Sequence, residues 1–193
     1  MEVEWVLLHC LAQLGRPDGR SAYLRLSTRP VRQGLSDVPA DPAARDRRRR
    51  QVIAGAYVLR GCSKPAVTVV AMGALVTEAL EAAERLEELQ VPAEVICVTS
   101  PKMLFEAVQA RRGRHDGPSW ILDQVFPAER AAPMVTVLDG HPHTLAFLPS
   151  INKVSTQTLG VSRFGRTGSL PDVYRYHGID ADAIVAASLD IVL

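Results

Sequence analysis

The sequence predicts an α/β domain of three layers, in which helices cover both faces of a mainly parallel five-stranded sheet with one antiparallel edge strand. Residues 67–72 (VTVVAM) are apolar without alternation, which is typical of a strand covered on both faces. Gly73 then leads into residues 76–88, where apolar side chains recur every three or four positions, as on one face of a helix. A second strand and helix, residues 94–100 and 101–111, follow directly. Consecutive units of this kind favour parallel strands joined by right-handed crossovers.

Length and composition restrict the functional classes. With 193 residues and 47% hydrophobic residues, the chain can bury the core of a folded domain. Twenty-two basic and twenty-one acidic residues leave a net charge of +1, which argues against nucleic acid or an anionic membrane as partner. The N-terminus carries Glu2 and Glu4 where a signal peptide has basic residues, and polar side chains interrupt its apolar run. We therefore expect neither a signal peptide nor a membrane span.

The three cysteines indicate the compartment. Cys10, Cys62 and Cys97 are odd in number and widely separated along the chain, and Cys97 falls within a predicted buried strand. This pattern is typical of reduced thiols rather than of a disulfide framework. We expect a cytoplasmic protein.

The first 31 residues contain too few elements for a domain of their own. A helix is expected over residues 2–14, with an apolar face. After a turn at residues 16–19, residues 21–27 (SAYLRLS) alternate as in a strand buried on one side. The side chains expected to face inward are Trp5, Leu8, Leu11 and Ala12 on the helix and Ala22, Leu24 and Leu26 on the strand. We interpret residues 1–31 as the C-terminal remnant of another domain.

Residues 32–50 are predicted to be a linker, because they lack apolar periodicity and contain two prolines. Arginines cluster at Arg45 and at residues 47–50. They could form a phosphate or nucleic-acid patch, or a solvated linker or helix start over an acidic neighbour. The second interpretation is favoured, because no aromatic residues lie between the arginines to stack on bases.

Residues 51–193 form the predicted domain. Residues 55–60 are expected to be the antiparallel edge strand, because a short connection leads from them to the strand at 67–72. Further strands are expected at 134–138 and 154–161. Residues 120–126 fit either a strand or a helix. Short helices are expected at 143–148, 170–176 and 180–189, the last two with Ser169 and Asp180 as N-caps.

Three glycine- or histidine-containing loops are candidate sites. The turn at Gly73 has one glycine where a dinucleotide-binding loop needs three, so we interpret it as structural. His141 and His143 follow a strand and could bind a metal or shuttle protons, but no third ligand is spaced nearby. A loop that contacts another domain is therefore favoured there. Residues 164–169 (FGRTGS) could hold an anion with Arg166 at a helix N-terminus, or could simply be a capped turn, and both interpretations remain open.

The order of these segments resembles a known family. The segments VTVVAMGALVTEALEAAERL, AEVICVTS, MVTVLDGH and LGVSRFGRTGSLPDVYRYHGIDADAIVAAS follow one another as in the C-terminal domain of transketolase-like enzymes. The resemblance covers residues 54–192 and is closest to the homodimeric type of pyruvate dehydrogenase first component, which ends in a similar LG-x3-FGRS-x-S segment. YLRLSTRP resembles the last strand of the pyrimidine-binding domain of transketolases. It implies that Arg29 matches an arginine that holds the substrate phosphate, although Thr28 intervenes between the serine and the arginine.

The resemblance also implies what this chain lacks. Family members bind thiamine diphosphate and Mg through a G-D-G motif and a later asparagine, in a separate domain. Here Asp139-Gly140 has no leading glycine and Asn152 follows too soon. The activating glutamate belongs to an early part of the pyrimidine domain that this chain does not contain. We therefore expect no catalytic, cofactor or metal residue on this chain, with thiamine diphosphate and Mg bound elsewhere in the parent enzyme.

The expected function is assembly and dimerisation, as the C-terminal domain or small subunit of a pyruvate dehydrogenase-like or transketolase-like enzyme. Arg29, His141, His143 and Arg166 are the residues expected at a substrate site or interface. The expected partners are a second copy, the catalytic subunit, or the acyltransferase component of a 2-oxo acid dehydrogenase complex. The alternative from another class is a stand-alone α/β module that binds a small anion at the carboxyl edge of the sheet. RNA binding through residues 45–50 is a third and weaker hypothesis.

Overall fold

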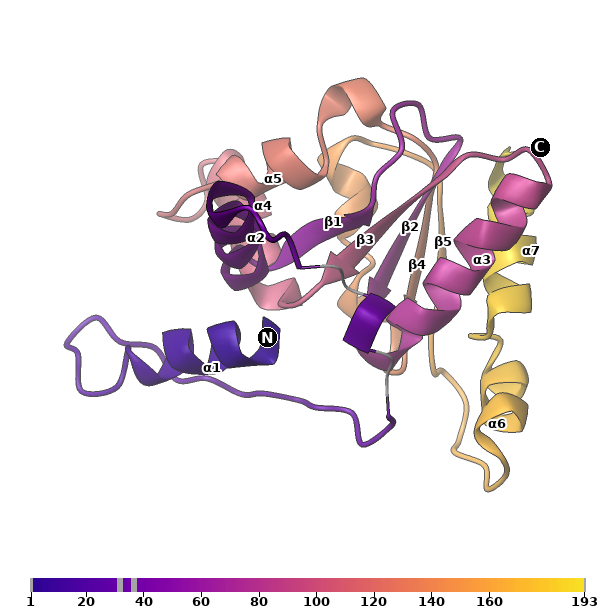
Figure 1. Cartoon of the computed structure of the whole chain (residues 1–193), viewed down its shortest axis with the longest axis horizontal. Helices are drawn as coiled ribbons and strands as arrows, with labels where there is room; N and C mark the ends of the chain where they lie inside the picture. The colour runs from indigo at the N-terminus through magenta and orange to yellow at the C-terminus, as the bar shows by residue number, and fades with distance from the viewer. Residues whose placement is uncertain (1, 31–32, 36–37, 193) are drawn as a thin grey trace.

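The computed structural model describes residues 2–30, 33–35 and 38–192. Its centre is a five-stranded sheet in the order β1-β3-β2-β4-β5, with helices on both faces (Figure 1). The strands are β1 (Ala56–Arg60), β2 (Val67–Met72), β3 (Ala93–Val98), β4 (Met134–Leu138) and β5 (Thr156–Leu159). The predicted three-layer α/β architecture is thereby confirmed.

Strand β2 lies at the centre of the sheet and is parallel to both neighbours. Its Val69 faces Val95 of β3 on one side and Val135 of β4 on the other, and all three are fully buried. Continuous apolar sequence is required here because both faces of the strand are covered. Helices α3 (Val76–Glu88) and α7 (Ala181–Val192) cover one face, and α4 (Pro101–Arg111) and α5 (Trp120–Val125) cover the other.

The two edge strands differ from the centre. β1 is antiparallel to β3, with Ala56 paired to Val98, so the predicted antiparallel edge is confirmed. The short connection from β1 to β2 does not form a hairpin, however, because β3 lies between these two strands. β5 forms the opposite edge, parallel to β4, and is shorter than the predicted 154–161 segment.

The helices form the outer layers. Figure 1 shows α3 and α7 on one side of the sheet and α2, α4 and α5 on the other. The helices are α1 (Glu2–Leu11), α2 (Pro42–Ala54), α3 (Val76–Glu88), α4 (Pro101–Arg111), α5 (Trp120–Val125), α6 (Leu170–His177) and α7 (Ala181–Val192). Residues 120–125 are thus helical, which decides between the two interpretations of that segment. In place of the short helix expected at 143–148, two 3-10 turns occur, at Pro142–Thr144 and Leu148–Ile151.

The helix termini are built from the residue types that the sequence indicates. The hydroxyl of Ser169 accepts a hydrogen bond from the Asp172 amide at the start of α6, and Asp180 accepts one from Ala183 at the start of α7. At the end of α2, Gly55 has φ +118°, and a Cβ there would lie 2.7 Å from the carbonyl oxygen of Ser100. Glycine is therefore required at this junction.

Two predictions for the N-terminal part are wrong. Residues 21–27 form no strand, and they are exposed, because no strand of the sheet lies beside them to pair with. Helix α1 ends at Leu11 and buries only Trp5, while Leu8 and Leu11 are 56% and 51% exposed. The predicted apolar face therefore points largely into solvent. We call residues 2–30 the N-terminal extension.

The predicted linker is partly a helix. Residues 42–50 belong to α2, and the carboxylate of its N-cap residue Asp41 accepts a hydrogen bond from the Ala44 amide. The arginine cluster lies on this helix, and the guanidinium of Arg48 stacks over the Tyr57 ring at 4.2 Å from its centroid. Packing of α2 against β1 explains why a sequence without apolar periodicity is helical here. Residues 31, 32, 36 and 37 lie outside the described residues.

The cysteines and the helices agree with the composition. Cys10, Cys62 and Cys97 are free thiols, and Cys97 is buried in β3 as predicted. Burial raises the pKa of the Cys97 thiol to about 12, so it is protonated and unreactive at neutral pH. No helix among the described residues is long and apolar enough to span a membrane.

Candidate functional site

The carboxyl ends of β2 and β4 define the position where open α/β sheets hold their ligands. The chain passes from β2 to β3 on one side and later returns to β4 on the other side, so the strand order reverses between β2 and β4. Met72 and Leu138, the last residues of these strands, are paired. A crevice at the carboxyl edge of such a switch point is the usual binding site of this fold class. We use the name switch-point crevice for this edge of the sheet and the side chains that meet there: Arg25, Arg29, Glu78, Asp139 and Tyr174.

Asp139, directly after β4, is the first charged residue at this crevice. Its Oδ1 accepts a hydrogen bond from Nη1 of Arg25 at 3.0 Å, and its carbonyl oxygen accepts one from Nη2 at 3.3 Å. Gly73, directly after β2, has φ +67°, and a Cβ there would lie 3.5 Å from Oδ1 of Asp139. A glycine suits this position because of its left-handed backbone, and it keeps the turn close to Asp139.

Glu78, in the first turn of α3, is the second carboxylate. Its Oε1 accepts a hydrogen bond from Nη1 of Arg29 at 2.7 Å. The same Arg29 nitrogen donates to the hydroxyl oxygen of Tyr174 on α6 at 3.5 Å, and the guanidinium lies 5.4 Å from the centroid of the Tyr174 ring. The other oxygen of Glu78, Oε2, is buried and accepts no hydrogen bond from a described residue.

The residues around Arg29 stabilise the charged form of its guanidinium group. Burial alone would lower its pKa, but hydrogen bonds to Glu78 and Tyr174 outweigh burial and raise the pKa above its ordinary value. Burial raises the pKa of Tyr174, and the hydrogen bond from Arg29 partly opposes that rise. At neutral pH the crevice therefore holds a positive Arg29 and a neutral Tyr174 beside a carboxylate.

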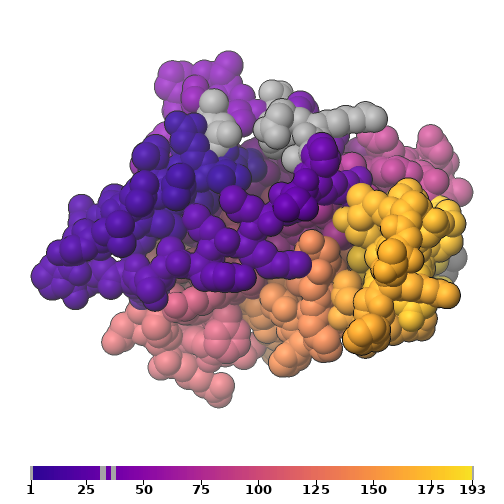
Figure 2. All heavy atoms as spheres, turned by 90° about the horizontal axis from the view of Figure 1, so that it is seen from below, coloured from indigo at the N-terminus to yellow at the C-terminus, as the bar shows by residue number. Residues whose placement is uncertain are grey.

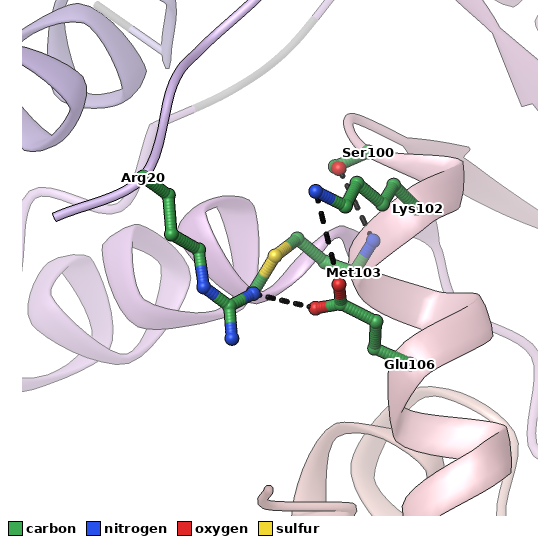
Figure 3. A network of polar contacts seen from close by, with 5 residues as sticks. All are labelled: Arg20, Ser100, Lys102, Met103 and Glu106. Atoms are coloured by element: carbon green, nitrogen blue, oxygen red, sulfur yellow. Dashed lines mark hydrogen bonds and ion pairs between the residues drawn. The ribbon is translucent and has the colours of Figure 1, made fainter. Parts of the chain in front are cut away.

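A third arginine pairs at the same edge of the molecule. Arg20 donates to Oε2 of Glu106 on α4 at 2.7 Å (Figure 3). Lys102, one turn earlier on α4, lies 3.8 Å from the other oxygen of Glu106. Figure 2 looks onto this edge and shows the N-terminal extension, in indigo to violet, lying beside the orange segment that follows β4.

The four predicted site residues do not form one site. Arg29 lies in the switch-point crevice. His141 and His143 lie on the loop after β4, where the His143 amide donates to Nδ1 of His141 at 3.3 Å. Arg166 lies on the loop before α6, with its guanidinium 5.0 Å from the centroid of the Tyr176 ring. His141 and His143 thus contact each other within one loop, and Arg166 contacts the helix that follows its own loop.

The structure adds residues that sequence reasoning missed. Arg25 contacts Asp139, and Glu78 and Tyr174 contact Arg29. These five residues come from four separate segments of the chain. The alternation of residues 21–27 predicts Arg25 on the solvent face of a strand, and that strand does not form. The spacing of arginines at 20, 25 and 29 is the one signal in the sequence that could have indicated a segment held by carboxylates.

Residues suited to thiamine diphosphate and Mg do not come together. Within the described ranges, no three His, Cys, Asp or Glu residues are grouped so that they could hold a metal ion. Asp139 is paired with Arg25, and the side-chain amide of Asn152 donates to the carbonyl oxygen of Phe126 at 3.0 Å. These residues do not fit a diphosphate-bound magnesium site.

Comparison with known proteins identifies the family. Residues 55–180 match the model of the transketolase-like TK C-terminal domain. No curated protein matches the sequence. Similar structures include the transketolase of Pichia stipitis in complex with sedoheptulose 7-phosphate, with a TM-score of 0.59 and 19% identity over 75% of this chain and 19% of that chain. The transketolase of Leishmania mexicana has a TM-score of 0.56 and 21% identity over the same shares of the two chains.

A third similar structure is a split-gene transketolase described as an inactive β4 tetramer. Its TM-score is 0.51, with 20% identity over 72% of this chain and 42% of that chain. The present chain thus spans about a fifth of the length of the full transketolases that it matches. Because the family model covers more than half of the sequence, the chain belongs to the family of transketolase-like C-terminal domains.

Proposed function

We propose that this chain is the C-terminal domain or small subunit of a thiamine-diphosphate enzyme, that it serves assembly and dimer contacts, and that the catalytic centre lies outside it. One observation carries the proposal: the chain belongs to the family but spans only 19% of the full-length transketolases. Thiamine diphosphate and Mg would be bound by the parts of the parent enzyme that this chain lacks. We place the assembly in the cytoplasm, in keeping with the free thiols.

The surface of the N-terminal extension supports a role in assembly. Most of the exposed large apolar side chains of the described chain lie there: Val3, Leu7, Leu8, Leu11, Leu14, Tyr23, Leu24 and Leu26. Leaving apolar surface in water costs roughly 25 cal/mol per Å². A concentration of such side chains on one segment is typical of a protein–protein contact. We propose that a second copy or the catalytic subunit covers it, as the tail of a pyrimidine-binding domain would be covered.

The parent enzyme is proposed to be of the pyruvate dehydrogenase type or of the transketolase type. Support for the first is the LGVSRFGRTGS segment, which is similar to the end of the homodimeric pyruvate dehydrogenase first component. In that case the acyltransferase component of the complex is a further partner. Support for the second is the similarity in fold to transketolases. The stand-alone anion-binding module gains no support, because Arg25 and Arg29 are already paired with Asp139 and Glu78 there.

The proposal is tested by reconstitution. The reading frames beside this one are searched for a product that carries a G-D-G motif and a thiamine-diphosphate domain. Co-expression of that product with this chain is expected to give a complex with transketolase or 2-oxo acid decarboxylase activity that neither chain has alone. If the neighbouring product neither binds this chain nor changes in activity with it, the subunit proposal is wrong.

A further inference from the structure

Three arginines hold one extended segment of the N-terminal extension against the sheet domain. Arg20 pairs with Glu106 of α4, Arg25 with Asp139 after β4, and Arg29 with Glu78 of α3. We call residues 20–29 the arginine strap. No main-chain hydrogen bond joins the strap to the sheet domain within the described ranges. The side-chain pairs are therefore the main polar attachment of this segment.

Two of these pairs fill the switch-point crevice. The side chains of Arg29 and Glu78 are only 24% and 12% exposed, whereas those of Arg25 and Asp139 are 53% and 27% exposed. The inner pair is thus shielded from solvent by its surroundings, and the outer pair is open to salt. The position where this fold class holds a ligand is already occupied by the chain itself.

The crevice has features that suit a guanidinium group better than an ammonium group. Nη1 and Nη2 of Arg25 donate to two different oxygens of Asp139, and the guanidinium of Arg29 lies over the Tyr174 ring. A guanidinium combines several fixed donors with a face that stacks on aromatic rings, and an ammonium does not. The buried and unfilled Oε2 of Glu78 offers a further acceptor.

We propose that the switch-point crevice is a guanidinium-binding site, and that the arginine strap is its built-in occupant and acts as a latch. In the closed state Arg25 and Arg29 occupy the acceptors of Asp139, Glu78 and Tyr174. A partner segment that presents arginine to this edge must displace the strap. The proposal does not depend on the parent enzyme, because it concerns contacts within this chain.

Limited proteolysis with chymotrypsin tests the latch on the full chain. Two highly exposed aromatic residues outside helices and strands serve as cleavage sites: Tyr23, 88% exposed and within the strap, and Phe164, 94% exposed and in the loop before α6. A protease requires a segment of several residues to leave the surface, so the latch should protect the bond after Tyr23 only. The ratio of the two initial cleavage rates therefore reports opening of the strap, with Phe164 as internal reference.

Replacement of the strap arginines should open the latch. R25Q/R29Q is expected to raise the rate ratio roughly three- to tenfold, as expected for loss of two partly exposed ion pairs. R47Q/R49Q removes the same charge from exposed positions of α2 and should leave the ratio unchanged. E78Q/D139N removes the two negative charges instead of the two positive ones, leaves one acceptor oxygen on each side chain, and should raise the ratio by a similar factor. An unchanged ratio in R25Q/R29Q overturns the latch.

A second comparison separates guanidinium recognition from simple charge. R25K/R29K keeps both positive charges, and it is expected to raise the ratio nearly as much as R25Q/R29Q does. Free arginine in the buffer should also raise the ratio of the unmodified chain above its value in lysine of equal ionic strength. If R25K/R29K cleaves like the unmodified chain and arginine acts like lysine, the guanidinium site is wrong.

Discussion

The sheet domain, residues 55–192, and the N-terminal extension, residues 2–30, differ in where they place apolar side chains. In β3 and β4 every residue is buried, and in β2 every residue except Met72. In the extension Trp5 alone is buried, against Val52, Tyr57 and Cys97. The sheet domain thus has a core of its own, whereas in the part of the chain that the structure describes Trp5, the partly buried Val6 and three ion pairs attach the extension to it.

Because the two regions differ in apolar burial, they have separate sources of stability. Strand register and helix packing supply the sheet domain with many buried contacts, and burial of apolar area is the dominant favourable term in folding. The extension has few such contacts and a solvated backbone, which is typical of a segment that opens locally at low cost or is completed by a partner. The predictions below test this contrast.

The largest effect is expected at the centre of the sheet. Val69→Asp places an unpaired charge among fully buried neighbours and should destabilise the chain by at least about 4 kcal/mol, close to the whole stability of many domains. Measured at a concentration where the chain is monomeric, Leu8→Asp on the exposed side of α1 should change stability by less than about 0.5 kcal/mol. Urea denaturation of the two variants measures both. Equal effects would contradict the contrast between the regions.

Glycine substitutions give a second matched pair. Gly55→Ala combines a positive φ with a 2.7 Å contact to the Ser100 carbonyl oxygen, so it should cost about 3 kcal/mol. Gly15→Ala in the extension has a φ of +73° but nothing within 4 Å of the added Cβ, so it should cost about 1 kcal/mol. Thermal unfolding of both variants compares them. A larger loss of stability in Gly15→Ala than in Gly55→Ala would show that the extension is more tightly packed than its exposed side chains indicate.

Association should depend on the extension and not on the sheet domain. The full chain is expected to be a dimer or larger at micromolar concentrations, and L7S/L11S/L14S should lower its mass in light scattering by exposing polar instead of apolar side chains. Leu89→Ser removes an equally exposed leucine at the end of α3 and serves as control. A chain that is monomeric without any substitution would refute the proposed contact surface.

A smaller effect concerns Glu94, a buried residue of β3. Burial raises its pKa above the ordinary value of 4.5, while Arg130, 3.2 Å away, partly opposes the rise. Because the folded-state pKa is the higher one, Glu94 stabilises the fold below pH 4.5, and this contribution is lost as pH rises through the folded-state pKa. Glu94→Gln should flatten the dependence of Tm on pH in this range, whereas Glu88→Gln should leave it unchanged. A curve for Glu94→Gln that parallels the unmodified chain would contradict this assignment.

No heat is expected when thiamine diphosphate and Mg are added to the isolated chain in a calorimeter. The physical reason is that the described residues contain no group of three His, Cys, Asp or Glu side chains that could hold a metal ion. A magnesium salt without the cofactor provides the baseline. A saturable micromolar isotherm would show a cofactor site on this chain and would overturn the division of roles proposed here.

The sheet domain can be predicted from the amino-acid sequence, because local pattern and global packing agree there. Continuous apolar strands predict burial on both faces, and the helix periods at 76–88 and 101–111 predict the covering layers. Caps at Ser169 and Asp180 are also readable, since capping depends on neighbouring residues alone. The position of β1 beside β3 was not readable, because strand order depends on contacts between distant segments.

The conformation of the extension and the residues that form the crevice depend on tertiary contacts. Residues 21–27 have the alternation of a strand, but a strand requires a neighbour, and none lies beside this segment. Residues 42–50 lack apolar periodicity and are helical because α2 packs on β1. Arg25, Arg29, Glu78, Asp139 and Tyr174 meet because the fold brings distant segments to one edge. Such long-range juxtaposition leaves no periodic signal in the chain, since each partner is locally an ordinary surface residue.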